Sequence, residues 1–261
     1  MKVVVCVKQV PDTNEVKLDP VKGTLIRDGV PSIMNPDDKA GLEAALRLKD
    51  QHGAHITVLS MGPPQADAIL REAYAMGADE CILVTDRAFG GSDTWATSSI
   101  LASALRKIGD YDLIITGRQA IDGDTAQVGP QIAEHLNVTD ISYCEGLSIE
   151  GDYVIVQRQY EDRYHMVKAK MPCLLTALSE MNKPRYMTPG GIYDAYREKT
   201  VTEFHRDDLD VADENIGLKG SPTRVAKSFT KQLKGKGTVV QLDTEESVDF
   251  LIEKLQEKFV L

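Results

Sequence analysis

The sequence passes from an apolar strand into a helix at the stretch Gly117-Arg118-Gln119-Ala120-Ile121-Asp122-Gly123-Asp124-Thr125-Ala126-Gln127-Val128-Gly129-Pro130. Residues 111–116 before it form a short apolar run typical of a buried strand, and residues 131–136 after it carry a narrow apolar stripe typical of a helix. Gly117 and Gly123 let backbone approach a ligand closely, and amides at the start of the next helix can face an anion. An ordinary turn would have the same composition, so the loop alone supports both interpretations equally. The Walker glycine and lysine pattern is absent, so the loop does not indicate a phosphate-cleaving enzyme.

Strands and helices alternate along the first half of the chain. Strand-like apolar runs lie at residues 3–7, 54–59, 81–84 and 111–116, and helix-like patterns separate or follow them. Asn35-Pro36-Asp37-Asp38 opens one such helix, which we expect to run to about Gln51. This alternation predicts an α/β fold with a doubly wound, mainly parallel sheet and right-handed crossovers.

Glycine-rich and hydroxyl-rich residues follow the carboxyl ends of the predicted strands. In a doubly wound sheet ligands bind outside those ends, so this placement favours nucleotide binding over a set of ordinary turns. Asn35 can also act simply as a helix cap, which from the residues alone is the favoured interpretation. For Thr94 and Thr97, capping of a helix and contact with a phosphate are about equally supported.

Composition limits the classes of function. The net charge of −10 argues against a nucleic-acid partner and against an anionic membrane surface. Cys6, Cys81, Cys144 and Cys173 lack the spacing of a metal site, so we expect buried, reduced thiols and no metal. No apolar run is long enough to span a bilayer and no signal peptide is evident, which predicts a cytoplasmic protein without membrane insertion. No Ser/His/Asp or Cys/His set indicates a catalytic residue.

The pattern of apolar and polar residues changes in the second half of the chain. Alternating residues at 153–160 and 165–170 predict an antiparallel hairpin beside the sheet, and residues 15–30 predict a hairpin-like excursion outside it. From residue 182 the chain is less regular. A final helix opening at Asp243 carries an apolar stripe of Val248, Leu251, Ile252, Leu255 and Phe259. We therefore expect an α/β domain at 1–216 and a C-terminal arm at 217–261 that packs on another subunit.

Five segments together resemble a known family. They are Asn35-Pro36, Ala75-Met76-Gly77-Ala78-Asp79, residues 117–129, residues 156–176 and residues 182–186. Within 156–176 the matching residues are Arg158, Glu161, Asp162, Val167, Pro172, Leu174, Leu175 and Thr176. Arg163 and His165 depart from the family pattern. Over nearly its whole length, the chain resembles the β subunit of electron transfer flavoproteins.

This resemblance implies a nucleotide-binding α/β fold of the adenine nucleotide hydrolase type and a heterodimer with an α subunit that holds FAD. By this resemblance, the nucleotide contacts of the family fall on Cys6, on Asn35, Pro36, Asp37 and Asp38, on Met61, and on Gly117, Arg118, Gln119, Ala120, Ile121, Asp122, Gly123, Asp124, Thr125, Ala126, Gln127 and Val128. In some members the β site holds AMP as a structural ligand. In electron-bifurcating members it holds a second FAD, which takes a hydride from NADH.

Two segments, residues 93–98 and 123–130, are similar to the bifurcating members. The resemblance therefore implies FAD in this chain, with Thr94 and Thr97 assisting the pyrophosphate and with Asp122 and Gln127 on polar edges of the cofactor. Electrons would pass to ferredoxin or flavodoxin and, through the FAD of the α subunit, to an acyl-CoA dehydrogenase. The alternative is a non-bifurcating subunit that holds AMP and docks dehydrogenases, and a weaker one is a stand-alone nucleotide sensor.

The segment after residues 184–186 matches the loop by which the family recognises dehydrogenases. Pro189 stands where mitochondrial members carry an anchoring leucine. We therefore expect a docking loop that lacks this anchor and contacts the dehydrogenase through Met187 or Ile192. The predicted docking residues are Tyr186, Met187, Pro189 and Ile192.

Overall fold

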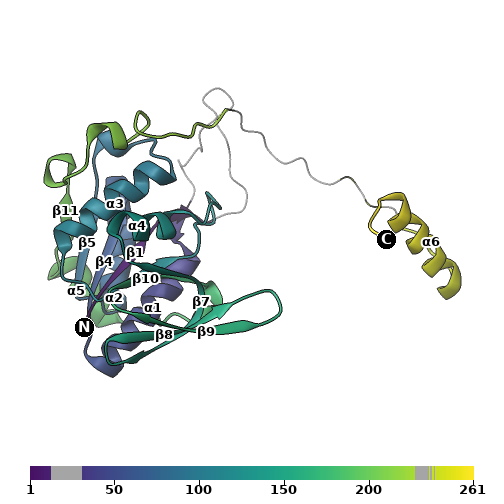
Figure 1. The fold of residues 1–261 in the computed structure, drawn as a ribbon, viewed down its shortest axis with the longest axis horizontal. Coiled ribbons are helices and arrows are strands. Elements are labelled where there is room, and N and C mark those ends of the chain that lie inside the picture. The colour runs from purple at the N-terminus through teal and green to yellow at the C-terminus, as the bar shows by residue number, and fades with distance from the viewer. Residues whose placement is uncertain (13–30, 227–234, 236, 238) are drawn as a thin grey trace.

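A nine-stranded sheet forms the centre of the protein (Figure 1). The computed structural model describes residues 1–12, 31–226, 235, 237 and 239–261. Within these residues the strand order is β11-β5-β4-β1-β6-β10-β7-β8-β9. The strands are β1 (Lys2–Val7), β4 (His55–Met61), β5 (Glu80–Val84), β6 (Leu113–Gly117), β7 (Thr139–Glu150), β8 (Tyr153–Gln159), β9 (Tyr164–Lys170), β10 (Cys173–Ala177) and β11 (Thr202–Phe204).

The middle of the sheet is parallel. β1 pairs with β4 on one side and β6 on the other, and β10 lies between β6 and β7. Residues 3–7 of β1 are buried, as expected for a strand covered on both faces. β7, β8 and β9 pair antiparallel at one side of the sheet. The predicted α/β class with a doubly wound, mainly parallel sheet is confirmed.

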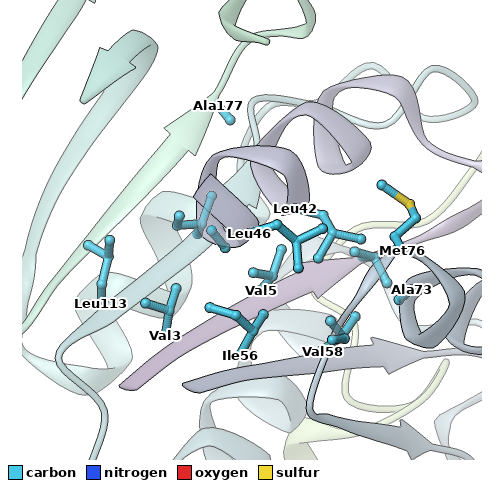
Figure 2. Close-up of a cluster of buried hydrophobic side chains, with 14 of the residues drawn as sticks. Val3, Val5, Leu42, Leu46, Ile56, Val58, Ala73, Met76, Leu113 and Ala177 are labelled. Atoms are coloured by element: carbon cyan, nitrogen blue, oxygen red, sulfur yellow. The ribbon is translucent and has the colours of Figure 1, made fainter. Parts of the chain in front are cut away.

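Helices cover both faces of the sheet. The helices of the described residues are α1 (Pro36–His52), α2 (Asp67–Met76), α3 (Thr94–Ile108), α4 (Val128–Leu136) and α5 (Pro189–Arg197), with α6 (Thr244–Glu257) away from the sheet and short 3-10 helices η1 (Pro64–Ala66), η2 (Arg87–Phe89), η3 (Ser179–Met181), η4 (Arg206–Asp208) and η5 (Asp213–Asn215). Side chains alternate between the two faces of a strand. Val3 and Val5 therefore join the core cluster beneath α1, where Leu42 lies (Figure 2), whereas Val4 joins the cluster beneath α3 and α4.

The boundaries of α1 follow from its sequence. Pro36 occupies the first turn, where its missing N–H costs no hydrogen bond, and Gly53 ends the helix in the left-handed region at φ 65°. Asp37 and Asp38 lie in the first turn, where their charge complements the helix dipole. The predicted start is confirmed, and the helix ends one residue after Gln51.

The predicted hairpin is part of the main sheet and does not lie beside it. β8 and β9 correspond to the two alternating runs, and β7, which the sequence did not reveal, joins them to β10. The alternation in β7 is hidden because its register shifts between Cys144 and Gly146 and because Tyr143 has a φ of 61°.

The segment after residue 182 is also more regular than expected. Prolines and glycines predicted irregular chain there, but Pro189 occupies the first turn of α5, and the Thr188 hydroxyl caps the helix by accepting a hydrogen bond from the amide of Gly191. A Cβ on Gly191 would lie 2.5 Å from the carbonyl oxygen of Ala75, so the glycine allows α5 to pack closely on α2. The segment is therefore a helix and not a loop at Pro189 and Ile192, and its role in docking stays a prediction.

Two short strands flank the predicted excursion. β2 (Gln9–Pro11) and β3 (Ser32–Met34) pair antiparallel in a small separate sheet. The hairpin predicted at residues 15–30 lies outside the described residues. No helix in the described part of the chain is long and apolar enough to cross a membrane.

The two ends of the predicted C-terminal arm differ in their contacts. Residues 217–223 form hydrogen bonds with the loop that follows η2. In α6, Asp243 caps the first turn through the amide of Glu246, and no residue of the helix is buried. Figure 1 shows α6 well away from the sheet. The division at residue 216 stays a prediction.

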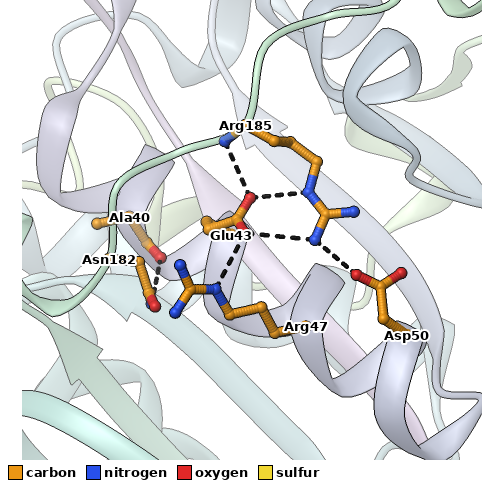
Figure 3. Close-up of polar contacts among 6 residues, drawn as sticks. All are labelled: Ala40, Glu43, Arg47, Asp50, Asn182 and Arg185. Atoms are coloured by element: carbon orange, nitrogen blue, oxygen red, sulfur yellow. Dashed lines mark hydrogen bonds and ion pairs between the residues drawn. The ribbon is translucent and has the colours of Figure 1, made fainter.

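An ion-pair network fastens residues 182–185 to α1 (Figure 3). The buried Glu43 carboxylate accepts hydrogen bonds from Arg185 Nε at 2.9 Å and from Arg47 Nε at 3.1 Å. Burial acts to raise the pKa of Glu43, but the hydrogen bonds from the two arginines outweigh it and lower that pKa below its ordinary value. Asp50 makes a second, more exposed contact with Arg185 at 2.8 Å.

The two acidic partners of Arg185 should differ in their effect on stability. Glu43→Gln should lower the free energy of unfolding by about 2 kcal/mol, because it replaces the buried carboxylate that accepts from both Arg185 and Arg47 with a neutral amide. Asp50→Asn, the matched control on the exposed side, should cost less than about 1 kcal/mol. Urea unfolding measures both, and equal losses for the two variants would contradict this assignment.

Candidate functional site

The order of the strands reverses at β1. The chain continues from β1 to β4 and β5 on one side, and then returns to form β6 on the other side. The carboxyl ends of β1 and β6 therefore diverge into helices on opposite faces of the sheet, which opens a crevice between them. Gly117, the first residue of the glycine-containing loop at residues 117–130, is the last residue of β6.

Asp38 bridges these two strand ends. Its Oδ2 accepts a hydrogen bond from the amide of Lys8 at 2.8 Å, directly after β1, and its Oδ1 accepts one from the amide of Gly117 at 2.9 Å. A Cβ on Gly117 would lie 2.2 Å from Asp38 Oδ1. Only glycine fits at this position, so Gly117 is needed for the hydrogen bonds by which Asp38 bridges the two strand ends.

Asn35 holds the loop that follows β6. Its Nδ2 donates to the carbonyl oxygen of Gln119 at 2.8 Å, and its Oδ1 accepts from the amide of Ile121 at 3.1 Å. The favoured interpretation of Asn35 as a simple helix cap is wrong, because its side chain makes no capping hydrogen bond to α1. The nitrogen and the oxygen of the buried Asn35 amide are thus both hydrogen-bonded to a segment more than eighty residues away along the chain.

The loop itself is held in an uncommon conformation. Asp124 and Ala126 both have a φ of 52°, in the left-handed region that non-glycine residues rarely adopt. The carbonyl oxygen of Ala120 accepts hydrogen bonds from the amides of Gly123 and Asp124, and Gln119 donates to the carboxylate of Asp124. Such positions persist where surrounding contacts fix them and are frequent at ligand sites.

The start of α4 leaves amide groups available. Its N-cap residue, Gln127, makes no side-chain capping bond, and the first turn holds no acidic residue. A Cβ on Gly129 would lie 2.6 Å from Thr116 Oγ1 and 2.9 Å from Thr176 Cγ2, so the glycine lets α4 approach β6 and β10 closely. This helix N-terminus has the chemistry of an anion site.

The start of α3 faces the same crevice but is already capped. Asp93 Oδ1 accepts from the amide of Ala96 at 3.0 Å, so Asp93 is the cap and not Thr94 or Thr97. Thr94 Oγ1 instead donates to Gln127 Oε1 at 2.9 Å, which joins α3 to α4. The capping interpretation of the two threonines is therefore wrong, and of the two helix starts that of α4 is the more open to an anion.

A cavity of about 470 Å³ lies between these elements, within the range of small-molecule sites. The predicted residues that line it are Cys6, Asp38, Met61, Thr94, Thr97, Gly117, Arg118, Gln119, Ala120, Gly123, Thr125, Ala126, Gln127 and Val128. A second cavity of about 900 Å³ extends toward Pro63, Asp86 and His205. The two share Lys8, Met61, Ser92 and Thr97, so they adjoin along the strand ends.

Other predicted residues support the cavity wall from behind. Asn35 and Asp38 position the loop, and Asp37 Oδ1 accepts from the amide of Ser179 at 3.1 Å. Asp122 pairs with Lys8 Nζ at 2.6 Å, so it ties the loop to the end of β1. Asn35, Asp37, Ile121, Asp122 and Asp124 do not line the cavity among the described residues.

Sequence reasoning missed several lining residues. They are Val7, Lys8, Leu59, Ser92, Asp93, Leu101, Thr116, Gly129 and Thr223. Lys8 is the first residue after β1, and this position was a signal that could have found it. Nothing in the local sequence pointed to Thr223, because it reaches the cavity through long-range contacts.

Two basic side chains line the cavity, and each lies near a carboxylate, Lys8 beside Asp122 and Arg118 beside Asp37. Lys8 lines both cavities, and Arg118 lines the smaller one. The Arg118 guanidinium lies 3.6 Å from Asp37 Oδ2 and 5.7 Å from the centre of the Tyr143 ring. These cations can attract a phosphate in addition to the amides of α4.

No nucleophile or metal site is evident in the described residues. Burial raises the pKa of the Cys6 thiol to about 12, and the charge of Asp38 adds to this, so Cys6 is a neutral thiol at neutral pH. No group of three or more His, Cys, Asp or Glu side chains in these residues could hold a metal ion. The arrangement can bind and orient a ligand, and any chemistry would come from that ligand.

The predicted docking residues lie far from Asp38 along the chain, around the start of α5. Tyr186, Met187 and Ile192 are exposed, with Tyr186 88% accessible. Tyr193 and Tyr196 on the same helix are exposed as well. We call these five residues the α5 patch. Exposed apolar side chains gathered in this way are typical of a protein-binding surface.

The ionisation of Asp38 should be visible in the pH dependence of stability. Burial raises the pKa of Asp38 to about 7, against the hydrogen bonds from Asn35, Lys8 and Gly117. Because an unfolded aspartate has a pKa of about 3.9, this group stabilises the folded state at low pH, and that contribution is lost as pH rises toward 7. The stability of the natural protein minus that of Asp38→Asn should fall between about pH 5 and about pH 7 in urea unfolding and then level off. A constant difference would show that Asp38 is ionised throughout this range.

Comparison with known proteins identifies the family. Residues 22–209 match the family model described as the electron transfer flavoprotein domain. The chain is 56% identical to "Electron transfer flavoprotein subunit beta" of Clostridium acetobutylicum, over 99% of each chain. It is 52% identical to "Caffeyl-CoA reductase-Etf complex subunit CarD" of Acetobacterium woodii and 48% identical to "Acryloyl-CoA reductase electron transfer subunit gamma" of Anaerotignum propionicum, over 100% of each chain in both cases. The chain that builds this crevice therefore belongs to the electron transfer flavoprotein β-subunit family.

Proposed function

We propose that this protein is the β subunit of an electron-bifurcating flavoprotein and that its crevice holds FAD. Subunits of this family pair with an α subunit and connect to dehydrogenase or reductase complexes. The bifurcating assignment goes further: NADH is the electron donor, and the acceptors are a low-potential carrier, ferredoxin or flavodoxin, and an acyl-CoA dehydrogenase reached through the FAD of the α subunit.

The residues of the crevice fit a flavin nucleotide. The amides at the start of α4, with Lys8 and Arg118 nearby, suit the pyrophosphate, and Thr94 and Thr97 can contribute hydroxyl groups. The strained, tightly held loop at residues 117–128 supplies backbone that a planar or phosphate group can approach. Bound FAD would accept a hydride and release electrons singly, whereas the protein binds it, orients it and sets its potential.

The observation that carries the choice of FAD is the pair of adjoining cavities. AMP has one phosphate and would occupy only one of them, whereas a dinucleotide can extend from the cavity of about 470 Å³ into that of about 900 Å³ past Lys8 and Thr97. The hydroxyl-rich start of α3 borders both. The names of two relatives also speak of reductase complexes acting on caffeyl-CoA and acryloyl-CoA, which supports an acyl-CoA dehydrogenase as the partner.

A second candidate function is an AMP-holding subunit that scaffolds the α subunit and docks dehydrogenases. One observation favours it: Asp93 already caps α3, so of the two helix starts beside the cavity that of α4 has the amides open to an anion. A single anion site suits a single phosphate. The two candidates differ in the nucleotide bound and in the reaction with NADH.

The α subunit is the proposed partner of the C-terminal arm. α6 carries exposed Val248, Leu251, Ile252 and Leu255, and none of its residues is buried in this chain. A helix with an apolar stripe is stable when that stripe packs on another surface. The exposed α5 patch is left for the dehydrogenase.

The nucleotide content decides between FAD and AMP. Acid extraction and chromatography of the purified αβ heterodimer should yield about two FAD per heterodimer, and NADH should reduce the flavin of the β subunit directly. Thr94→Val with Thr97→Val should lower the FAD content of the β subunit and abolish NADH oxidation, because the Thr97 hydroxyl and the hydrogen bond from Thr94 to Gln127 at the cavity wall are lost. Thr139→Val, at the exposed amino end of β7 and away from the carboxyl ends of β1 and β6, is the matched control and should leave both unchanged.

A single FAD with stoichiometric AMP in the natural heterodimer would overturn the bifurcating assignment and establish the AMP-holding alternative. Circular dichroism of the double variant serves as the check that it remains folded.

The α5 patch should be required for transfer to a dehydrogenase. Met187→Asp with Ile192→Asp places charge in an apolar contact, so it should slow reduction of an acyl-CoA dehydrogenase at least about tenfold while the flavin content is unchanged. Thr139→Asp adds a charge at a distant exposed site and should have no effect. Stopped-flow flavin absorbance measures the rate, and unchanged transfer by the double variant would remove the α5 patch from the docking surface.

A further inference from the structure

The first residues of the C-terminal arm are fastened to the wall of the cavity. We call residues 217–223 the arm root. The amide of Gly217 donates to Ser92 Oγ at 3.1 Å, and the amide of Leu218 donates to the carbonyl oxygen of Gly90 at 3.1 Å. In the opposite direction, the amide of Asp93 donates to Ser221 Oγ at 2.8 Å. The arm root and the loop before α3 are thus bonded in both directions.

The fit of the arm root is specific. Gly217 has a φ of 60°, and a Cβ there would lie 2.2 Å from the carbonyl oxygen of Ala88, so the backbone can sit this close only with glycine. Ser221 is buried, and its hydroxyl donates to the carbonyl oxygen of Gly217 at 2.8 Å. A segment fixed by such contacts has one defined position on the loop.

Asp93 connects the arm root to the helix that lines the cavity. Its Oδ1 caps α3, whereas its Oδ2 accepts from both the amide and the hydroxyl of Thr223, at 2.9 Å and 2.7 Å. Thr223 in turn lines the cavity of about 470 Å³ together with Asp93, Thr94 and Thr97. One carboxylate therefore holds both the first turn of α3 and the end of the arm root.

We propose that Thr223 completes the nucleotide site and that nucleotide binding and attachment of the arm stabilise each other through Asp93. A ligand that contacts Thr223 binds more tightly when the arm root is in place, so it stabilises the attached arm root. By linkage, attachment of the arm root raises the affinity for the ligand by the same factor. The proposal rests on the proposed function in two respects, which are that the crevice holds a nucleotide and that the far end of the arm binds the α subunit.

The chemistry of this side of the cavity identifies the part of the nucleotide that it contacts. The Thr223 hydroxyl gives its proton to Asp93, so its oxygen can only accept a further hydrogen bond. The Asp93 carboxylate is also an acceptor. Acceptors suit the hydroxyl groups of a ribose or ribityl chain and repel a phosphate. Thr223 therefore faces the sugar portion, which AMP and FAD both provide.

The test measures nucleotide affinity in the αβ heterodimer freed of its β-site nucleotide. Thr223→Val should weaken binding of added AMP or FAD about fivefold, the equivalent of one hydrogen bond. Thr223→Ser keeps the hydroxyl and should restore the natural affinity, whereas Thr139→Val should not change it. Equal affinity for the natural protein and Thr223→Val would overturn the assignment of Thr223.

The coupling is tested by the association of the separate β chain with the α subunit. The natural β chain should bind the α subunit more tightly when AMP or FAD is present. This enhancement, the ratio of the affinities for the α subunit with and without nucleotide, should fall toward one in Thr223→Val. Gly217→Ala, which displaces the arm root and with it Thr223 but changes none of the side chains that line the cavity, should reduce it as well, provided that circular dichroism shows a folded protein. The same enhancement in the natural chain and in Thr223→Val would overturn the coupling.

A natural β chain that binds the α subunit equally with and without nucleotide would also overturn the coupling while pairing with the α subunit still stands. A natural β chain that does not bind the α subunit at all would instead refute the proposed role of the arm. The affinity of Thr223→Val for nucleotide would still decide the assignment of Thr223 in that case.

Discussion

The site depends on one carboxylate, that of Asp38, which accepts backbone hydrogen bonds from the ends of both β1 and β6. These strands lie where the strand order reverses, and the Asp38 bridge joins their ends in addition to the sheet behind them and the Lys8–Asp122 ion pair. The bridge requires α1 to begin directly beside the sheet edge, which Pro36 supports, and it requires glycine at position 117. Asn35, next to this helix, then fixes the loop that leads to α4.

The crevice lies beside this bridge, and its two sides differ in chemistry. At α4 the amides are open and Lys8 and Arg118 lie nearby, which suits an anion. At α3 the carboxylate of Asp93 already occupies the helix start and also holds the arm root. The same side chain thus belongs to the cavity wall and to the segment that leads to α6. Under the proposed function, this arrangement is the link that we infer between cofactor binding and assembly of the heterodimer.

The sequence predicted those features that depend on local patterns. The β-branched run of β1, the start of α1 and the glycine loop after β6 were all visible in consecutive residues. The contacts of Asn35, Lys8 and Thr223 were not, because their partners lie far away in the chain. β7 was hidden by a bulge, and α5 by the proline and glycines that in fact start it and allow close packing. Local pattern thus located the crevice, and tertiary contacts decided which side chains form its wall.

The most direct test is a crystal structure of the purified αβ heterodimer with the nucleotide that it retains. The account predicts a nucleotide between the ends of β1 and β6, with a phosphate on the amides at the start of α4 and a sugar hydroxyl facing Asp93 and Thr223. Asp38 should bridge Lys8 and Gly117 in the complex as it does here. A nucleotide bound outside this crevice, or one whose phosphates lie away from α4, would contradict it.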